Sequence, residues 1–148
     1  MNIEKQVCNI KQAIKLKELG IVQESQCYHY QKITPLNPNL HEYGFRQEYM
    51  PCYISTTGKK SVISGNRVFY EYSAFTVAEI GVMLKELCYC QFLSGEKNWI
   101  SSDCGSFETY PEDDCTAKTM IESMTTMLIH QLENKIIEVG ACNERLLA

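Results

Sequence analysis

The sequence predicts an α+β fold: a mostly antiparallel sheet packed by one long C-terminal helix and two or three shorter helices. Three observations predict it. A helix-start signal lies at residues 75–80, short alternating segments and turn residues fill the middle of the chain, and residues 113–134 carry a helical apolar period. Because no linker, repeat or low-complexity tract interrupts the 148 residues, we expect a single globular domain over residues 1–148.

The first predicted helix covers residues 9–19. Asn9 and Gln12 have the spacing of a capping pair, and an apolar face follows them as far as Gly20. Gly20 suits the left-handed conformation that ends many helices, and Leu16 and Ile21 then occupy the two positions that a Schellman motif brings into contact. Both ends of this helix are therefore visible in the sequence.

Short strands are expected in the middle third of the chain. An alternating, aromatic-rich segment comes first, and Pro35 and Pro38 end it in a loop. Glycine-containing turns separate the segments that follow. The strands predicted here are residues 27–31, 52–55, 61–63 and 67–72.

A second helix is predicted over residues 76–87. Thr76 and Glu79 have the three-residue spacing of a capping box, and Phe75 and Ile80 have the spacing of a hydrophobic staple. Apolar residues then recur at the i, i+3, i+4, i+7 spacing of an amphipathic helix as far as Leu87. These residues predict architecture and carry no chemistry.

The last third predicts a three-stranded meander followed by two helices. The meander strands are residues 89–93, 98–101 and 106–109. Pro111 and the acidic residues 112–114 suit the first turn of a long helix over residues 113–134, where negative charges meet free amides. Asn134 suits its end, and residues 139–147 predict a short final helix.

Charge and composition disfavour several classes of partner. The 18 acidic residues against 14 basic ones give a net charge of −4, which repels a phosphate backbone, so we expect no nucleic-acid binding. No apolar run approaches the roughly 18 to 20 residues of a membrane span, and the N-terminal residues have no apolar leader segment. We therefore expect no membrane association, a cytoplasmic location and eight reduced cysteines.

Three segments taken together resemble a known group of sequences: LKELGIVQES (16–25), SAFTVAEIG (73–81) and LENK (132–135). They are similar to small uncharacterised proteins encoded by prophages and other mobile elements of gut bacteria. That family has no established activity, so the resemblance transfers no catalytic residue. What it implies is a bacterial cytoplasm and a phage or mobile-element context.

Two cysteine and histidine spacings are candidate metal-ligand pairs, Cys88-x-Cys90 and Cys27-x-His29. Each pair shares one face of a strand, but structural zinc sites more often use two- to four-residue knuckles, and free cysteine is commonly buried. We interpret these thiols as core or surface residues and expect no metal ligand and no cofactor.

Catalytic residues are not evident either. A cysteine nucleophile needs a nearby base, and the three candidates, His29, His41 and His130, lie in no recognisable nucleophile motif. No phosphate-binding glycine loop is present, and Asp113 and Asp114 are explained as charges of a helix start. The sequence favours a non-enzyme.

The candidate partner surface consists of four tyrosines, Tyr28 with Tyr30 and Tyr70 with Tyr72, because each pair shares one face of a predicted strand. The competing interpretation is that they cover a half-buried sheet. We hypothesise a phage or mobile-element accessory protein that acts by protein–protein association, with another protein or with a second copy of itself. The alternative is a small enzyme or ligand-binding protein whose site is assembled from scattered residues. A large concave pocket favours the alternative, and an exposed apolar patch favours association.

Overall fold

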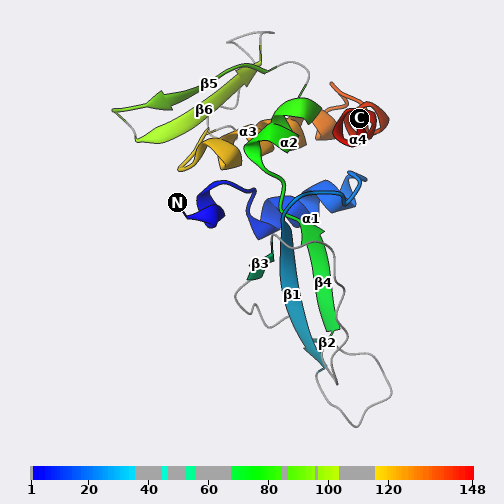
Figure 1. Cartoon of the computed structure of the whole chain (residues 1–148). Helices are drawn as coiled ribbons and strands as arrows, with labels where there is room; N and C mark the ends of the chain where they lie inside the picture. Colours follow the sequence, from blue (N-terminus) through cyan, green and yellow to red (C-terminus); the bar gives the residue numbers. More distant parts are fainter. Residues whose placement is uncertain are drawn as a thin grey trace.

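A computed structural model of the chain describes residues 2–35, 45–46, 53–55, 68–84, 87–95, 97–103 and 116–148. Within these ranges the chain forms helices and two small antiparallel sheets, which confirms the predicted α+β class (Figure 1). The elements in chain order are η1 (Ile3–Lys5), α1 (Ile10–Glu18), β1 (Tyr28–Pro35), β2 (Phe45–Arg46), β3 (Tyr53–Ser55), β4 (Val68–Ser73), α2 (Val77–Met83), β5 (Leu87–Leu93), β6 (Asn98–Asp103), β7 (Thr116–Ala117), α3 (Met120–Glu133) and α4 (Val139–Leu147).

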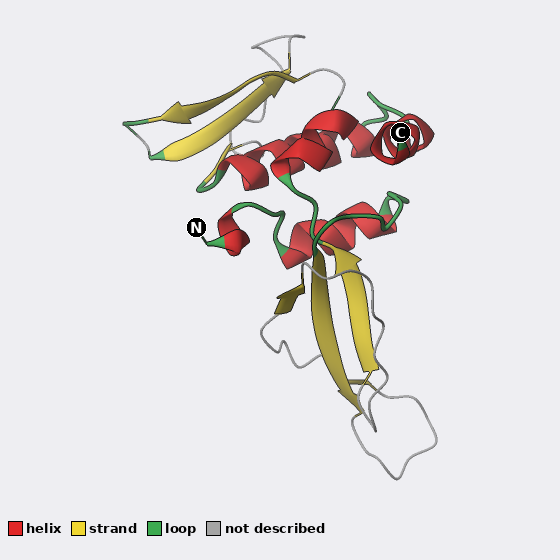
Figure 2. Ribbon diagram, in the orientation of Figure 1, coloured by secondary structure: helices red, strands yellow, loops and turns green. Residues whose placement is uncertain are grey.

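The strands form two separate sheets, on opposite sides of the helices (Figure 2). In the first, β1 pairs with β4 from Tyr28↔Ser73 to Ile33↔Val68, with β3 from Tyr28↔Ser55 to Tyr30↔Tyr53, and with β2 at Thr34 and Pro35. In the second, β6 lies between β5 and β7. We predicted one sheet; the helices instead lie between two groups of strands, and α3 packs on the second sheet.

Helix α1 confirms both of its sequence signals. The Asn9 side chain accepts from the Gln12 amide at 3.0 Å, and the Gln12 side chain accepts from the Asn9 amide at 3.3 Å. At the other end Gly20 has φ +94°, the Ile21 amide donates to the Leu16 carbonyl, and the Gly20 amide donates to the Lys17 carbonyl. This is the hydrogen-bond pattern of a Schellman motif.

Helix α2 has the predicted start but ends earlier than predicted. Thr76 and Glu79 form the capping box, and Phe75 and Ile80 are fully buried in the same core cluster. Leu84, however, is already extended, and β5 begins at Leu87. The apolar period that predicted a helix to Leu87 therefore runs across a helix end into a strand.

Helix α3 begins at Met120, so the predicted start at residue 113 is wrong. Thr116 and Ala117 pair with β6 as strand β7, and the Thr119 side chain then caps the helix by accepting from the Glu122 amide. The acidic residues 112–114 lie outside the described residues. The helix ends at Asn134 as predicted, and α4 has the predicted bounds.

The remaining strand predictions have mixed outcomes. β1, β3 and β4 overlap the predicted segments, although β1 continues to Pro35. The predicted strands at residues 61–63 and 106–109 lie outside the described residues. The third strand of the second sheet is β7, which lies later in the chain than the predicted one.

The main core forms where α1, α2, α3 and α4 meet, and its buried residues run from Cys8 to Cys142. Helix α3 is central, because it packs on α1 and α2 and also on the second sheet. Polar groups set its position against α1: the Gln12 side chain donates to the Glu122 carbonyl at 2.9 Å and to the Thr126 hydroxyl at 3.1 Å. The prediction of one domain over residues 1–148 stays a prediction.

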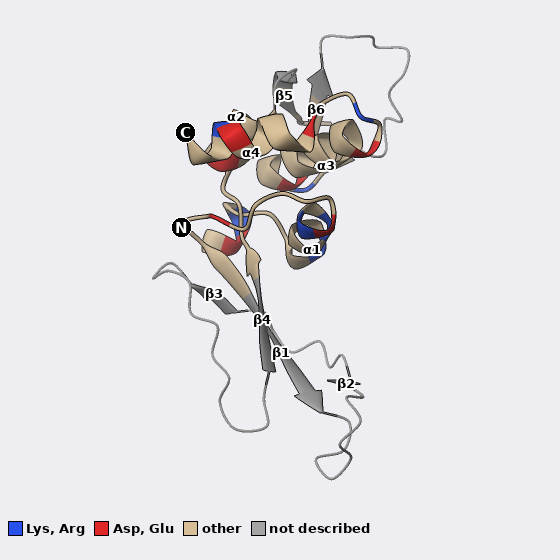
Figure 3. Ribbon diagram, turned by 90° about the vertical axis from the view of Figure 1, so that its right-hand side faces the viewer, with Lys and Arg blue, Asp and Glu red and all other residues tan. Residues whose placement is uncertain are grey.

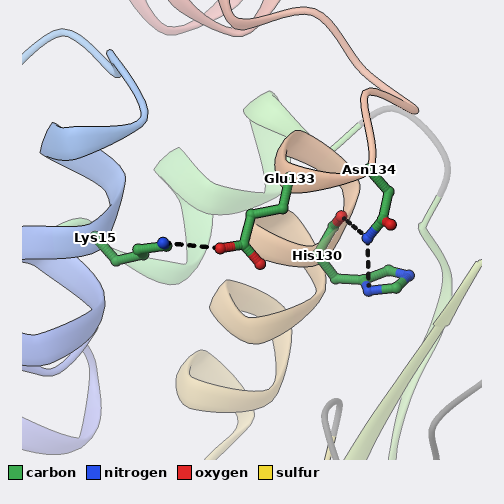
Figure 4. Close-up of polar contacts among 4 residues, drawn as sticks. All are labelled: Lys15, His130, Glu133 and Asn134. Atoms are coloured by element: carbon green, nitrogen blue, oxygen red, sulfur yellow. Dashed lines mark hydrogen bonds and ion pairs between the residues drawn. The ribbon is translucent and has the colours of Figure 1, made fainter.

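Exposed polar pairs finish the end of α3 (Figure 4). Lys15 of α1 and Glu133 form an ion pair at 2.8 Å, and the Glu133 carboxylate raises the pKa of the Lys15 ammonium. The Asn134 amide group donates to the His130 carbonyl at 2.8 Å and lies 3.2 Å from the His130 Nδ1. Exposed ion pairs contribute little stability, so we expect these contacts at the C-terminal end of α3 to have little effect on the fold.

The Glu79 carboxylate joins α2 to the loop before β1. Its Oε2 accepts from the Thr76 amide at 2.7 Å, the Thr76 hydroxyl at 2.9 Å and the Ser25 hydroxyl at 3.0 Å. Its Oε1 accepts from the Gln26 amide at 3.1 Å. The Glu79 carboxylate therefore connects two segments that are far apart in the sequence. Hydrogen bonds to an ionised carboxylate are stronger than those between neutral groups, so this connection is a strong one.

We predict that Glu79→Ala destabilises the protein more than Thr76→Ala does. Loss of the Thr76 cap costs about 0.5 to 2 kcal/mol, whereas loss of the carboxylate removes both the cap and the loop anchor and costs about 2 to 4 kcal/mol. Glu133→Ala, which removes only the exposed ion pair, is the matched control and should change little. Urea denaturation measures all three; equal losses for Glu79→Ala and Glu133→Ala would contradict the loop anchor.

Candidate functional site

The four predicted tyrosines do not form one exposed surface. Tyr28 is only 3% exposed, and its hydroxyl accepts from the Ser25 amide at 3.2 Å. Tyr72 is half-buried, packs against the main core and lies under the Lys17 ammonium at 4.9 Å. Tyr30 and Tyr70 lie in β1 and β4, with side chains outside the described part of the structure.

The strand register also places Tyr28 and Tyr72 on opposite faces of the first sheet. Residues directly opposite each other in an antiparallel ladder share a face, and successive residues alternate. Tyr28 is opposite Ser73, and the next residue, His29, is opposite Tyr72. Tyr28 is therefore a core residue, and Tyr72 joins the first sheet to α1.

A buried polar contact lies where β1 meets the N-terminal segment. The His29 side chain is 4% exposed, and its Nε2 lies 2.6 Å from the Cys8 carbonyl oxygen. A carbonyl oxygen only accepts, so Nε2 carries the hydrogen and Nδ1 of the neutral ring is an acceptor. Nδ1 is buried without a hydrogen-bond partner among the described residues.

Burial makes these groups unreactive in the folded protein. Burial raises the pKa of the Cys8 thiol to about 12, and it also raises the pKa of the Cys27 thiol. Burial lowers the pKa of His29, against the smaller effect of its hydrogen bond to Cys8. A neutral thiol is a poor nucleophile, so neither Cys8 nor Cys27 is activated by the nearby imidazole.

Metal binding gains no support from the part of the chain that the structure describes, where no group of three or more His, Cys, Asp or Glu side chains could hold an ion. Cys27 and His29 are both buried, and Cys90 instead accepts from the Ser101 hydroxyl at 3.3 Å. The Cys88 side chain and His41 lie outside the described residues. One candidate pair lies at the start of β1 in the first sheet and the other lies on β5 of the second sheet, so the fold does not join the two pairs into one site.

Gln131 is a polar residue that the sequence analysis did not single out. It lies on α3, fully buried, and neither amide atom has a hydrogen-bond partner among the described residues. In the sequence, a glutamine on an otherwise apolar helix face is the one feature that could have indicated this buried polar residue. It does not line the surface hollow described next, so it adds no ligand group there.

The clearest exposed apolar feature lies on α2, beside α4. Ala78, Gly81 and Val82 are exposed at the i, i+3, i+4 spacing of one helix side, and Val82 is 49% exposed; we call these three residues the α2 face. A shallow hollow of about 180 Å³ adjoins this face. The residues around the hollow are Ala78, Glu79, Val82, Arg145, Leu146 and Ala148.

Other exposed apolar side chains are more scattered. Phe92 and Trp99 face each other across β5 and β6 with ring centroids 5.5 Å apart, and Phe92 is 46% exposed. Ile136 and Leu147 are also exposed, in the turn before α4 and near its end. Single exposed apolar residues are common on protein surfaces, whereas Ala78, Gly81 and Val82 lie together on one side of one helix.

The surface charge differs between the helices. Basic side chains are concentrated on α1, which carries Lys11, Lys15 and Lys17 (Figure 3). Lys15 and Lys17 are already engaged with Glu133 and Tyr72. The α2 face has no charged residue of its own, although Arg145 lines the adjoining hollow.

No protein-family model, curated protein or solved structure matches the chain. The described part of the chain also contains no helix with the length and apolar character that a bilayer crossing requires.

We predict that a thiol reagent at pH 8.5 modifies Cys90 at least about a hundredfold faster than Cys8 in the folded protein. Cys90 is half-buried, whereas a thiol with a pKa of about 12 is almost entirely protonated at this pH. Peptide mass spectrometry after timed labelling resolves the two sites, and labelling in urea gives the unfolded reference. Equal rates in the folded protein would contradict the burial of Cys8.

Proposed function

We propose that the protein acts by association with another protein chain, and that the α2 face is the centre of the contact. The observation that carries the proposal is the exposure of Val82 on a helix whose opposite side, with Ile80 and Met83, is fully buried. Apolar side chains that a folded helix leaves in water gain stability when a partner covers them.

The hollow beside the α2 face suits a protein partner better than a drug-sized ligand. Sites for cofactors and drug-sized ligands usually have volumes of about 300 to 1,000 Å³ and enclose most of the ligand. The hollow of about 180 Å³ is smaller and open. It suits one protruding apolar side chain of a partner, with the Arg145 side chain at its wall as a hydrogen-bond donor.

The biological setting is part of the same proposal. The resemblance to prophage and mobile-element proteins supports a phage-related accessory role in a bacterial cytoplasm. The expected reduced state of the cysteines belongs to the same cytoplasmic setting. The net charge of −4 favours a protein over a nucleic acid as the partner.

The proposal predicts that Val82→Glu abolishes association while leaving the fold intact. A charge at the centre of an apolar contact should weaken binding by at least about 30-fold, which corresponds to about 2 kcal/mol. Light scattering over a concentration series tests a second copy as partner, and affinity capture from the native host tests other proteins. Lys118→Glu, a charge change at an exposed residue outside the α2 face, is the matched control.

The outcome depends on the comparison between variants. The proposal is supported if the purified protein forms a dimer or directly binds one identified partner. That association must be lost in Val82→Glu and retained in Lys118→Glu. Val82 is half in water, so the unfolding midpoint of Val82→Glu should stay close to that of the wild type. If both variants bind as the wild type does, or if neither self-association nor a direct partner is found, the α2 face is not an interface.

A further inference from the structure

The segment before α1 packs against β4, the start of α2 and the main core, and the Cys8 thiol lies 3.9 Å from the Ser73 carbonyl oxygen. Val7 pairs with Thr76, and the Cys8 amide donates to the Phe75 carbonyl at 2.9 Å. Val7 and Cys8 are buried, and Ile3 packs against the small cluster of Val7, Cys27 and Ala74. We call residues 2–8 the N-terminal strap; it ends where Asn9 caps α1.

His29 binds this strap to β1 through one hydrogen bond, from Nε2 to the Cys8 carbonyl at 2.6 Å. The neutral ring makes that bond with its one N–H group. Protonation would place a second N–H on Nδ1, which is buried and has no partner among the described residues. A buried cation with an unpaired donor is costly, so the closed strap requires neutral His29.

Among the described residues, no acidic side chain hydrogen-bonds to His29. Tyr72 is directly opposite on β4, and the Lys17 ammonium of α1 lies over the Tyr72 ring, on the same side of the sheet as His29. From the strap comes the Cys8 thiol, which is protonated at neutral pH. The Glu79 carboxylate of α2 acts on the thiols of Cys8 and Cys27, and both of its oxygens are engaged by the capping box and the loop before β1.

We propose that the N-terminal strap is a pH-sensitive latch: protonation of His29 releases residues 2–8, including Cys8 of the main core, from β1 and from the start of α2. Release exposes Cys8 and Cys27, while the rest of the helical core, with Cys142, stays folded. The proposal concerns a part of the molecule distinct from the α2 face and does not depend on the proposed function.

The direction of the pH effect follows from the burial of His29. Burial lowers its pKa in the closed state, whereas in the open strap it returns to about 6.5. The latch is therefore fully stable above about pH 6.5 and weakens as the pH falls below that value, until the closed state is also protonated. Between pH 7.5 and 5.5 the open fraction should rise about five- to tenfold.

The experiment measures how fast each cysteine of the full chain reacts with 4,4′-dithiodipyridine, a reagent that remains active at acid pH. Rates at pH 7.5 and 5.5 are divided by those of the same chain in urea, and peptide mass spectrometry resolves the sites. Cys142, buried in α4, reports opening of the core. Relative labelling of Cys8 and Cys27 should rise about five- to tenfold on acidification, with Cys142 unchanged.

Two variants separate His29 from other titrating groups. His29→Gln retains an N–H donor for the Cys8 carbonyl but does not titrate, so its labelling should be independent of pH. His130→Gln, at a half-buried histidine of α3, should behave as the wild type. The latch is overturned if wild-type labelling does not change with pH, if Cys142 rises together with Cys8 and Cys27, or if His29→Gln keeps the rise. Should His29→Gln fail to fold, the wild-type comparison among the three cysteines still decides.

Discussion

The arrangement of the chain depends on the carboxylate of Glu79. It completes the capping box of α2, and it holds Ser25 and Gln26 where the chain leaves the α1 loop and enters β1. Ser25 in turn accepts from the Cys27 amide, and the Cys27 carbonyl accepts from the Ala74 amide. One charged group therefore fixes the start of a helix, the start of a strand and the distance between them, which places the first sheet against the helices.

The contacts of Glu79 with Ser25 and Gln26 also explain why the α2 face and the N-terminal strap lie on different sides of α2. The start of α2 is engaged by the strap and by the loop before β1, so the side that faces them is covered. Ile80 and Met83 pack into the core against α3 and α4, which leaves Ala78, Gly81 and Val82 facing outward. The strap, in contrast, depends on His29 of β1, whose position follows from the same loop.

Local signals in the sequence predicted local structure well. Local interactions explain this, since the Asn9–Gln12 pair, the Thr76–Glu79 pair and Gly20 act on backbone groups a few residues away. Their roles could therefore be predicted without knowledge of the fold. Contacts between residues far apart in the sequence could not be predicted in this way. Residues 116 and 117 read as helix but pair with β6, and the bond from Ser25 to Glu79 spans 54 positions. The burial of Tyr28 and the exposure of Val82 depend on which elements pack together, and alternation or helical period alone does not determine that.

The most direct test of the account is a double-mutant cycle between Ser25→Ala and Glu79→Gln, measured by urea denaturation of the two single variants and the double variant. If the Ser25 hydroxyl and the Glu79 carboxylate stabilise the junction together, the two losses are not additive, and the coupling free energy is about 1 to 3 kcal/mol. Losses that add to within about 0.3 kcal/mol would show that the two residues act independently, and would contradict the central role of Glu79.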